Sequence, residues 1–281
     1  MEQNLIIYTN LFTLQGRNVE DNRYIDMFYI WLHRVMKNGC LGSKDSIALL
    51  VDKVTIEFMK KSNLFNHLIS KLRCNLYFFT YDQPSTLKDG FLERFYYKKI
   101  TSKFATNSIF LQVDIDVLVN DNLRNLFSTN IQSNTIYLNS EMGILESNYY
   151  GLLATDEDKK MLTDKGMQHA PGFTAGTFAF TTGNKVEEFF NYIVSLFDCE
   201  SSFYTVDQPF FNAGIFKYLY KDEDPELNFY PIDERLIAVN VYSCDISGEP
   251  NPVLLNFCGE PGKEFFHWDK IFTELFVGSY K

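Results

Sequence analysis

The stretch "SIFLQVDIDVLV", residues 108–119, joins an apolar run to two closely spaced acids, Asp114 and Asp116. Side chains alternate between the two faces of a strand, so both acids are predicted to point to one face and Ile115 into the core. A carboxylate in an apolar run loses its hydration unless a cation, a metal or several hydrogen-bond donors compensate. Two hard oxygen donors on one face can bind Mg²⁺ or Mn²⁺ and leave coordination positions for phosphate oxygens.

Short apolar runs alternate with longer amphipathic runs ahead of this stretch. We predict strands over "NLIIYT" (4–9), "SIALLV" (46–51) and "NLYFFT" (75–80). A helix is predicted over 24–39, closed by Gly39, and a second helical stretch follows the strand 46–51 and ends at residue 72. This rhythm is typical of βαβ units on a mostly parallel sheet, with "SIFLQV" as the fourth strand. Ligands collect beyond the carboxyl ends of such strands, which is where Asp114 and Asp116 lie.

The second half of the chain has a different pattern. A strand is predicted over "TFAFTT" (177–182), followed by helices over 184–197 and from about Asp207 to Tyr220. The polar segment 156–172 is predicted to be a mobile loop. We therefore expect one α/β domain spanning residues 1–281, with a mostly parallel central sheet flanked by helices and with two halves, 1–120 and 121–281.

Composition narrows the class of protein. The 281 residues are 46% hydrophobic and carry a formal net charge of -10 with no basic stripe, so a nucleic-acid partner is disfavoured. No apolar run reaches the 18 residues of a membrane span, and the amino terminus lacks the pattern of a signal peptide. The five cysteines lack metal-ligand spacing, which favours reduced thiols and a cytoplasmic protein: Cys40, Cys74, Cys199, Cys244 and Cys258.

Six ordered motifs carry a family resemblance. The strand with its Asp-x-Asp, polar turn and Leu-Phe segment resembles the metal site of GT-A fold glycosyltransferases, particularly the glycogenin-like retaining family (family 8 type). The other matches are a first strand ending in a Thr-Asn turn, lysines 16 and 15 residues ahead of Asp114, and three later segments: "NLIIYTN", Lys98 and Lys99, "FTAGTFAF", "DQPFFN" and "NFCGEPGK". Their order over residues 5–263 is more specific than any one of them.

The resemblance implies a role for each motif. Asp114 and Asp116 would hold Mn²⁺ or Mg²⁺ on the diphosphate of a UDP-sugar, which neutralises charge as the diphosphate leaves. Tyr8, Thr9 and Asn10 would hold the nucleotide base, and Gly259 and Lys263 would close over the phosphates. Lys98 and Lys99 would supply a positive charge for the phosphates or the sugar, and the small residues Ala175 and Gly176 would let the sugar approach the backbone. Asp207 and Gln208 would face the transferred sugar and the acceptor. Residues 1–120 would then form the nucleotide-sugar half and 121–281 the acceptor half.

The chain departs from the family pattern at two positions. Asn256 stands where the family has a histidine as third metal ligand, and Thr174 stands where it has an asparagine on the sugar side. The first change replaces an imidazole with a weaker, neutral amide oxygen. The second weakens any inference about the donor sugar and about retention.

Several alternatives remain open on the sequence. Asp114 and Asp116 could be structural acids paired with Lys98 and Lys99, and Asp207 could be only a helix cap. A haloacid-dehalogenase-like phosphatase also uses an Asp-x-Asp, and a glycosyltransferase homologue could bind nucleotide or glycan without turnover. We predict a metal-dependent glycosyltransferase that moves a sugar, with retention, from a UDP-sugar to a hydroxyl of a glycan, a protein or a small molecule.

Overall fold

The computed structural model describes residues 3–127, 131–197, 207–221, 224–239 and 252–257. The chain divides into two compact units. The amino-terminal unit comprises residues 5–84, 113–128 and 233–281, and the central unit comprises residues 1–4, 85–112 and 129–232. The predicted division of one domain at residue 120 stays a prediction.

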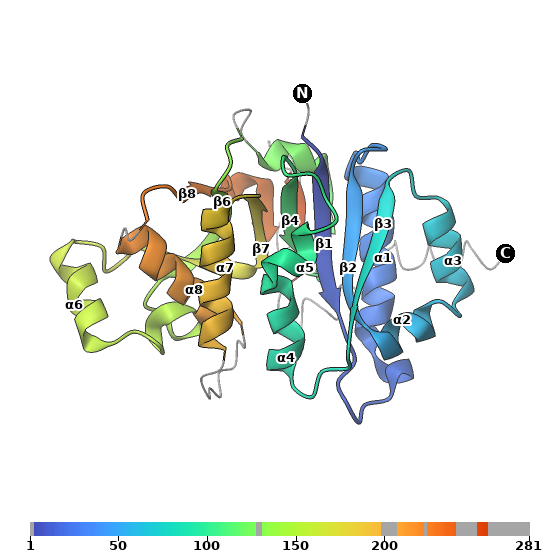
Figure 1. Ribbon diagram of the computed structural model, residues 1–281, viewed down its shortest axis with the longest axis horizontal. Coiled ribbons are helices and arrows are strands. Elements are labelled where there is room, and N and C mark those ends of the chain that lie inside the picture. Colours follow the sequence, from blue (N-terminus) through green and yellow to red (C-terminus); the bar gives the residue numbers. More distant parts are fainter. Residues whose placement is uncertain (1–2, 128–130, 198–206, 222–223, 240–251, 258–281) are drawn as a thin grey trace. The chain divides into compact units, whose positions relative to one another are not determined.

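The amino-terminal unit is built on three parallel strands in the order β3-β2-β1. These are β1 (Leu5–Leu11), β2 (Ser46–Asp52) and β3 (Asn75–Tyr81), and every residue of β1 and β2 is buried. The helices α1 (Arg23–Asn38), α2 (Lys53–Met59) and α3 (Asn63–Ser70) lie beside them (Figure 1). The predicted βαβ rhythm is confirmed here, because the three strands are parallel and helices connect β1 to β2 and β2 to β3.

Local sequence fixes where α1 begins and ends. The side chain of Asn22 accepts a hydrogen bond from the Tyr24 amide (3.1 Å) and so caps the amino end. Gly39 follows the carboxyl end, and a Cβ atom there would lie 2.6 Å from the Val35 carbonyl oxygen. The predicted closure at Gly39 is confirmed, and its reason is close packing. The middle of α1, residues 27–32, is buried on all sides, and Phe28 and Trp31 stack there at 5.7 Å between ring centroids.

A small second sheet completes the amino-terminal unit. Its strands are β5 (Val117–Val119), β9 (Ile237–Val239) and β10 (Leu254–Asn256), in the order β5-β10-β9. Strand β10 runs antiparallel to β5 and parallel to β9. The β5–β10 pairing joins residues that are more than 100 positions apart in the sequence.

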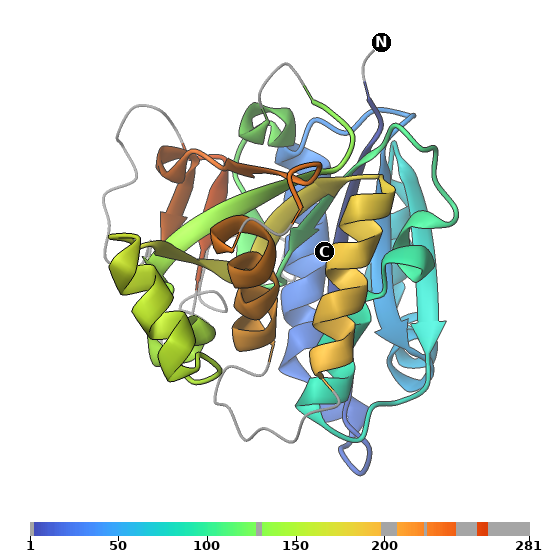
Figure 2. The ribbon, with the colours of Figure 1, turned by 60° about the vertical axis from the view of Figure 1, so that its left-hand side comes forward.

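The central unit has a mixed sheet in the order β4-β7-β6-β8. Its strands are β4 (Ile109–Val113), β6 (Thr135–Gly143), β7 (Pro171–Thr181) and β8 (Asn228–Pro231), with β6 antiparallel to β7 and parallel to β8. Its helices are α4 (Leu87–Leu92), α5 (Tyr97–Thr101), α6 (Asp156–Asp164), α7 (Asn184–Leu196) and α8 (Gln208–Ile215). Figure 2 shows α7 and α8 side by side.

Buried aromatic rings form the core of the central unit. Phe95 lies 5.9 Å from Phe211 and 6.1 Å from Phe178, measured between ring centroids, and Phe180 lies 4.8 Å from Phe190. All five side chains are at most 1% exposed. Both units therefore place helices against a sheet, which confirms the predicted α/β class.

The prediction of a loop over residues 156–172 is wrong for its first half, where α6 lies. Thr155 and Asp158 form a capping box, in which each side chain accepts a hydrogen bond from the other residue's amide. Leu162 is fully buried, and Lys221 forms an ion pair with Asp158 at 3.0 Å. The charged residues of this segment thus cap and anchor a helix.

Within the described ranges, no helix is both long enough and apolar enough to cross a bilayer.

Candidate functional site

Asp114, Ile115 and Asp116 form a turn between β4 and β5, here called the carboxylate turn. The Val117 amide donates a hydrogen bond to the Asp114 carbonyl oxygen (3.0 Å), so the strand is interrupted at this point. Ile115 is 5% exposed, whereas the two aspartates are half-buried. The predicted contrast between buried isoleucine and accessible acids is confirmed, but a turn produces it in place of a regular strand.

The small sheet brings Asn256 beside the carboxylate turn. Asn256 lies opposite Val117 in the antiparallel β5–β10 pair, and the Phe257 amide donates to the Asp116 carbonyl oxygen (2.9 Å). The backbones of the three predicted metal ligands are therefore adjacent. No cluster of three His, Cys, Asp or Glu suited to a metal occurs in the described parts of the chain. Asn256 as the third ligand stays a prediction. Two carboxylates and one amide are oxygen donors of the kind that Mg²⁺ and Mn²⁺ bind.

The carboxyl end of β1 carries the predicted base-binding residues. Tyr8 and Thr9 are fully buried, while Asn10 is 8% exposed and accepts a hydrogen bond from the Tyr81 hydroxyl (2.7 Å). Of the three, Asn10 thus has the most accessible side chain. Their role in binding a base stays a prediction.

Asp52, which the sequence analysis did not single out, supports the segment that follows β1. Its buried carboxylate caps α2 through the amides of Val54 and Thr55, and it also accepts from the Thr13 amide (2.9 Å). The signal that could have found it is an acid at a strand end directly before a helix.

In the central unit, Arg94 and Asp207 form a buried ion pair. The Arg94 Nη1 lies 3.2 Å from Asp207 Oδ2, and these side chains are 3% and 13% exposed. The same nitrogen donates to the Ala175 carbonyl oxygen (3.1 Å), and the guanidinium stands 4.9 Å from the centre of the Phe91 ring. Arg94 therefore ties the start of α8 to β7 at the predicted sugar-side residue Ala175.

Asp207 occupies the cap position of α8, but its side chain makes no capping hydrogen bond. The alternative of a simple helix cap is therefore wrong for this carboxylate. Gln208, the next predicted residue, donates from Nε2 to the Asn148 carbonyl oxygen (3.2 Å).

Asn212 fixes the distance between α8 and β7. Its fully buried side chain accepts from the Phe173 amide (2.8 Å) and donates to the Phe173 carbonyl (2.7 Å) and the Gln208 carbonyl (2.9 Å). This amide acts as a short additional strand partner for β7. Gln208 lies one helical turn ahead of Asn212, so this link also anchors the start of α8 to β7.

Strand β7 is irregular at the predicted sugar-side motif. The β6–β7 register shifts between Leu138 and Ser140, and on β7 the Thr174 hydroxyl accepts a hydrogen bond from the Gly176 amide (3.0 Å). Asn139 Nδ2 and Thr177 Oγ1 are buried and have no hydrogen-bond partner in the described parts of the chain. Buried polar groups are normally paired, so these two atoms are exceptions in the central unit.

The two predicted lysines are paired with carboxylates of their own unit. Lys98 lies 2.8 Å from Glu187, which raises the pKa of this lysine by a hydrogen bond and by its charge. Lys99 pairs with Glu93. The buried cation of the region is Arg94, 20 residues ahead of Asp114, which the sequence analysis missed. Gly259 and Lys263 lie outside the described residues.

The fold is shared with solved glycosyltransferase structures. The bifunctional glycosyltransferase WbbM superimposes with a TM-score of 0.56 at 13% identity, over 92% of this chain and 46% of WbbM. The glycosyltransferase GlyE of Streptococcus pneumoniae TIGR4 gives 0.52 at 15% identity, over 99% of this chain and 64% of GlyE. Mouse xyloside xylosyltransferase 1 gives a TM-score of 0.50 at 13% identity, over 90% of this chain and 97% of the mouse protein.

These similarities concern the fold alone, because all three identities are low. The chain spans about half the length of WbbM and about two thirds of GlyE. No protein-family model matches the chain, and no curated protein matches it by sequence. The fold class predicted for the chain is confirmed by this agreement.

Proposed function

We propose that the chain is a metal-dependent glycosyltransferase that transfers a sugar from a UDP-sugar to a hydroxyl group of a glycan, a protein or a small molecule. The observation that carries the proposal is the carboxylate turn with Asn256 in register beside it, on a fold shared with solved glycosyltransferases. An oxygen-rich donor set at the end of an apolar strand suits a cation that also binds phosphate oxygens.

Asp114, Asp116 and Asn256 would hold Mn²⁺ or Mg²⁺, and the ion would stabilise the negative charge of the departing diphosphate. In the retaining reaction that we propose, the bond between the anomeric carbon and the phosphate oxygen breaks. A bond from that carbon to the acceptor oxygen forms on the same face. The acceptor proton passes to a leaving phosphate oxygen, so the step needs no strong protein base.

Asp207 would face the positive charge that develops on the sugar, and Gln208 would orient the acceptor. Arg94 is a positioning residue in this scheme, because its ion pair and its bond to the Ala175 carbonyl hold the Asp207 carboxylate in one place. The buried polar atoms of Asn139 and Thr177 offer hydrogen bonds to a sugar hydroxyl from the same unit.

The test is a panel of UDP-sugars incubated with Mn²⁺ and candidate acceptors, with release of UDP and anomeric configuration of the product as readouts. Asp116→Asn should lower turnover by roughly 100-fold or more, as expected when a metal ligand that stabilises charge is lost. Asp82→Asn is the matched control, since it removes one carboxylate of the amino-terminal unit that is 90% exposed and pairs with Lys53.

Three outcomes would contradict the proposal. Full activity of Asp116→Asn would exclude the metal assignment. UDP binding with no turnover of any donor would indicate a binding homologue. Hydrolysis of phosphate esters without UDP binding would indicate a phosphatase instead.

A further inference from the structure

A cavity of about 600 Å³ lies in the amino-terminal unit between α1 and α3. None of its lining residues belongs to the candidate site. The cavity is also lined by residues that lie just after α1 and α3, and by Cys74, which directly precedes β3. The cavity is therefore a separate feature of this unit.

The lining of the cavity is basic and apolar, with no acid. The apolar side chains are Met36, Leu41, Leu68 and Leu72, and the nitrogen-bearing side chains are His33, Lys37, His67, Lys71 and Arg73. The whole chain carries a formal net charge of -10, so this concentration of cations runs against its average composition. A positive lining with an apolar floor suits an anion that also has an apolar part.

Local structure explains some of these cations but not all of them. Lys37 lies in the last turn of α1 and Lys71 directly follows α3, where helix carbonyl groups favour a positive charge. Arg73 lies beyond that helix end and ahead of β3. No ion pair joins Lys37, Lys71 or Arg73 to an acid in the described ranges of the chain.

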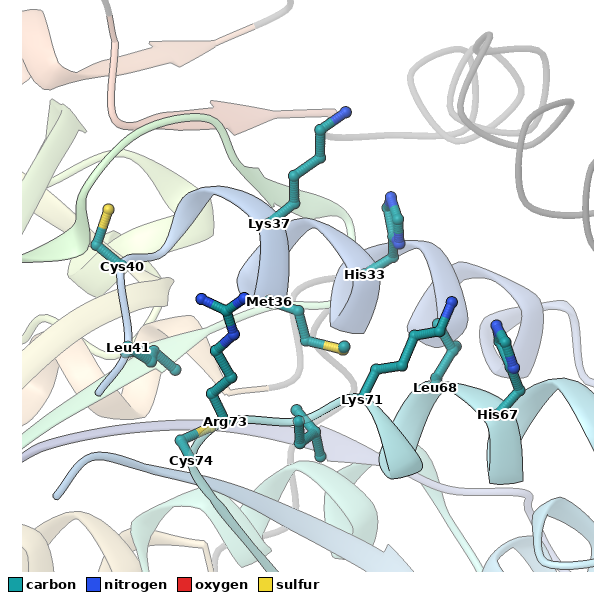
Figure 3. A pocket seen from close by; sticks show the side chains of 11 residues that line it. His33, Met36, Lys37, Cys40, Leu41, His67, Leu68, Lys71, Arg73 and Cys74 are labelled. Carbon is teal, nitrogen blue, oxygen red and sulfur yellow. The ribbon is translucent and has the colours of Figure 1, made fainter. Parts of the chain in front are cut away.

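The side-chain directions favour Arg73 as the main anion ligand. In Figure 3 the Arg73 and Lys71 side chains extend from the α3 side toward α1, and Met36 points toward them from α1. Lys37 points outward at the rim. A planar guanidinium with parallel N–H groups matches two oxygens of one phosphate, and a nearby ammonium adds a point charge.

We propose that this cavity binds a phosphorylated amphiphile, with its phosphate on Arg73 and Lys71 and its apolar part on Met36, Leu41, Leu68 and Leu72. The phosphate could belong to a soluble ester or to the headgroup of an anionic phospholipid. The inference does not depend on the proposed transferase activity.

Binding is tested with two probes on the full chain. Short-chain phosphatidic acid below its micelle concentration, titrated by calorimetry, represents a soluble ester. Phosphatidylcholine vesicles with and without phosphatidic acid, in a flotation assay, represent a membrane source. Binding of the monomeric probe alone identifies a soluble ligand, and binding only to vesicles that contain phosphatidic acid identifies a headgroup.

The variant Lys71→Ala/Arg73→Ala should weaken binding roughly 10-fold or more, because two charge-assisted contacts are lost. Lys44→Ala/Lys61→Ala is the matched control: it removes the same charge from two exposed lysines of the same unit that do not line the cavity. Near-normal binding by the control is expected. Equal weakening of both double variants, or no binding of either probe by the unmodified protein, would overturn the proposal.

Thiol alkylation gives a second readout. Cys40 is exposed at the cavity, so a bound amphiphile should slow its reaction with iodoacetamide, followed by mass spectrometry of the Cys40 peptide. Burial raises the pKa of Cys74 to about 11, which keeps that thiol protonated and slow to react. Unchanged alkylation of Cys40 at a saturating probe concentration would contradict binding in this cavity.

Discussion

At the scale of single residues, Arg94 is the cation on which the start of α8 depends. Its removal would take the guanidinium away from the buried Asp207 carboxylate and from the Ala175 carbonyl oxygen. Breaking a buried ion pair from one side costs about 3–5 kcal/mol. We therefore expect Arg94→Ala to lose about that much free energy of unfolding, measured by urea titration.

Arg235→Ala provides the control for Arg94. Arg235 also pairs with an aspartate, Asp233, but the two side chains are 72% and 38% exposed. Exposed pairs contribute about 0–1 kcal/mol, so this variant should unfold nearly as the unmodified protein does. Equal losses in the two variants would show that burial does not govern the Arg94 pair.

Asp158 should make stability depend on pH. Burial alone would raise the pKa of this carboxyl, but hydrogen bonds from Lys221, Tyr150 and Thr155 outweigh burial and lower the pKa from 3.8 to about 2. Because the folded state holds the ionised form more strongly, ionised Asp158 stabilises the folded state. This contribution to the free energy of unfolding is complete above about pH 4 and is lost as the pH falls toward 2. It amounts to about 2 kcal/mol.

The measurement for Asp158 is urea unfolding across a pH series. Asp158→Asn should be less stable than the unmodified protein at neutral pH, and the difference should shrink between about pH 4 and pH 2. Asp164→Asn, at an exposed position of the same helix, serves as the control. A difference that stays constant over this range would contradict the assigned pKa shift.

At the scale of secondary structure, Asn212 connects a helix to a strand. Asn212→Ala would leave the Phe173 amide and carbonyl groups buried without their partner. Each such loss costs about 1–3 kcal/mol, so we expect about 3 kcal/mol of destabilisation by urea unfolding. Turnover should also fall, because α8 carries Asp207 and Gln208 at its start.

Asn66→Ala is the corresponding surface control. Its side chain donates one exposed hydrogen bond to the Lys60 carbonyl, at the start of α3. Loss of that bond should change the free energy of unfolding by less than about 1 kcal/mol. If Asn212→Ala were equally mild, the side chain would not be the link between α8 and β7.

The sequence predicts secondary structure well where the apolar pattern is local. Strands β1, β2 and β4 were predictable because continuous apolar runs of this length indicate strands buried on both faces. The run of β3 is also apolar, although this edge strand is only partly buried. Helix α6 was missed because its charged residues resemble a loop, although Thr155 and Asp158 already have the spacing of a capping box. The carboxylate turn was predicted as strand because alternating exposure occurs in both geometries.

At the scale of the whole molecule, the site could be predicted only where one segment contains it. Asp114 and Asp116 are close in sequence, and their exposure followed from local pattern. Arg94 and Asp207 are more than 100 residues apart, and no local rule pairs them. The resemblance to a known family selected Asp207 and Asn256, but only the strand register showed that Asn256 lies beside the carboxylate turn.

The proposed metal and nucleotide should stabilise the folded chain together. A ligand present at 100 times its dissociation constant adds about 2.7 kcal/mol to the free energy of unfolding. We expect UDP with Mn²⁺ to raise the melting temperature by several degrees, and UDP with EDTA to leave it unchanged, since the metal joins the diphosphate to the carboxylate turn. Asp116→Asn should abolish the shift, whereas Asp82→Asn should retain it. A full shift in the presence of EDTA would place the nucleotide on residues other than Asp114 and Asp116, even if the protein proved to be a transferase.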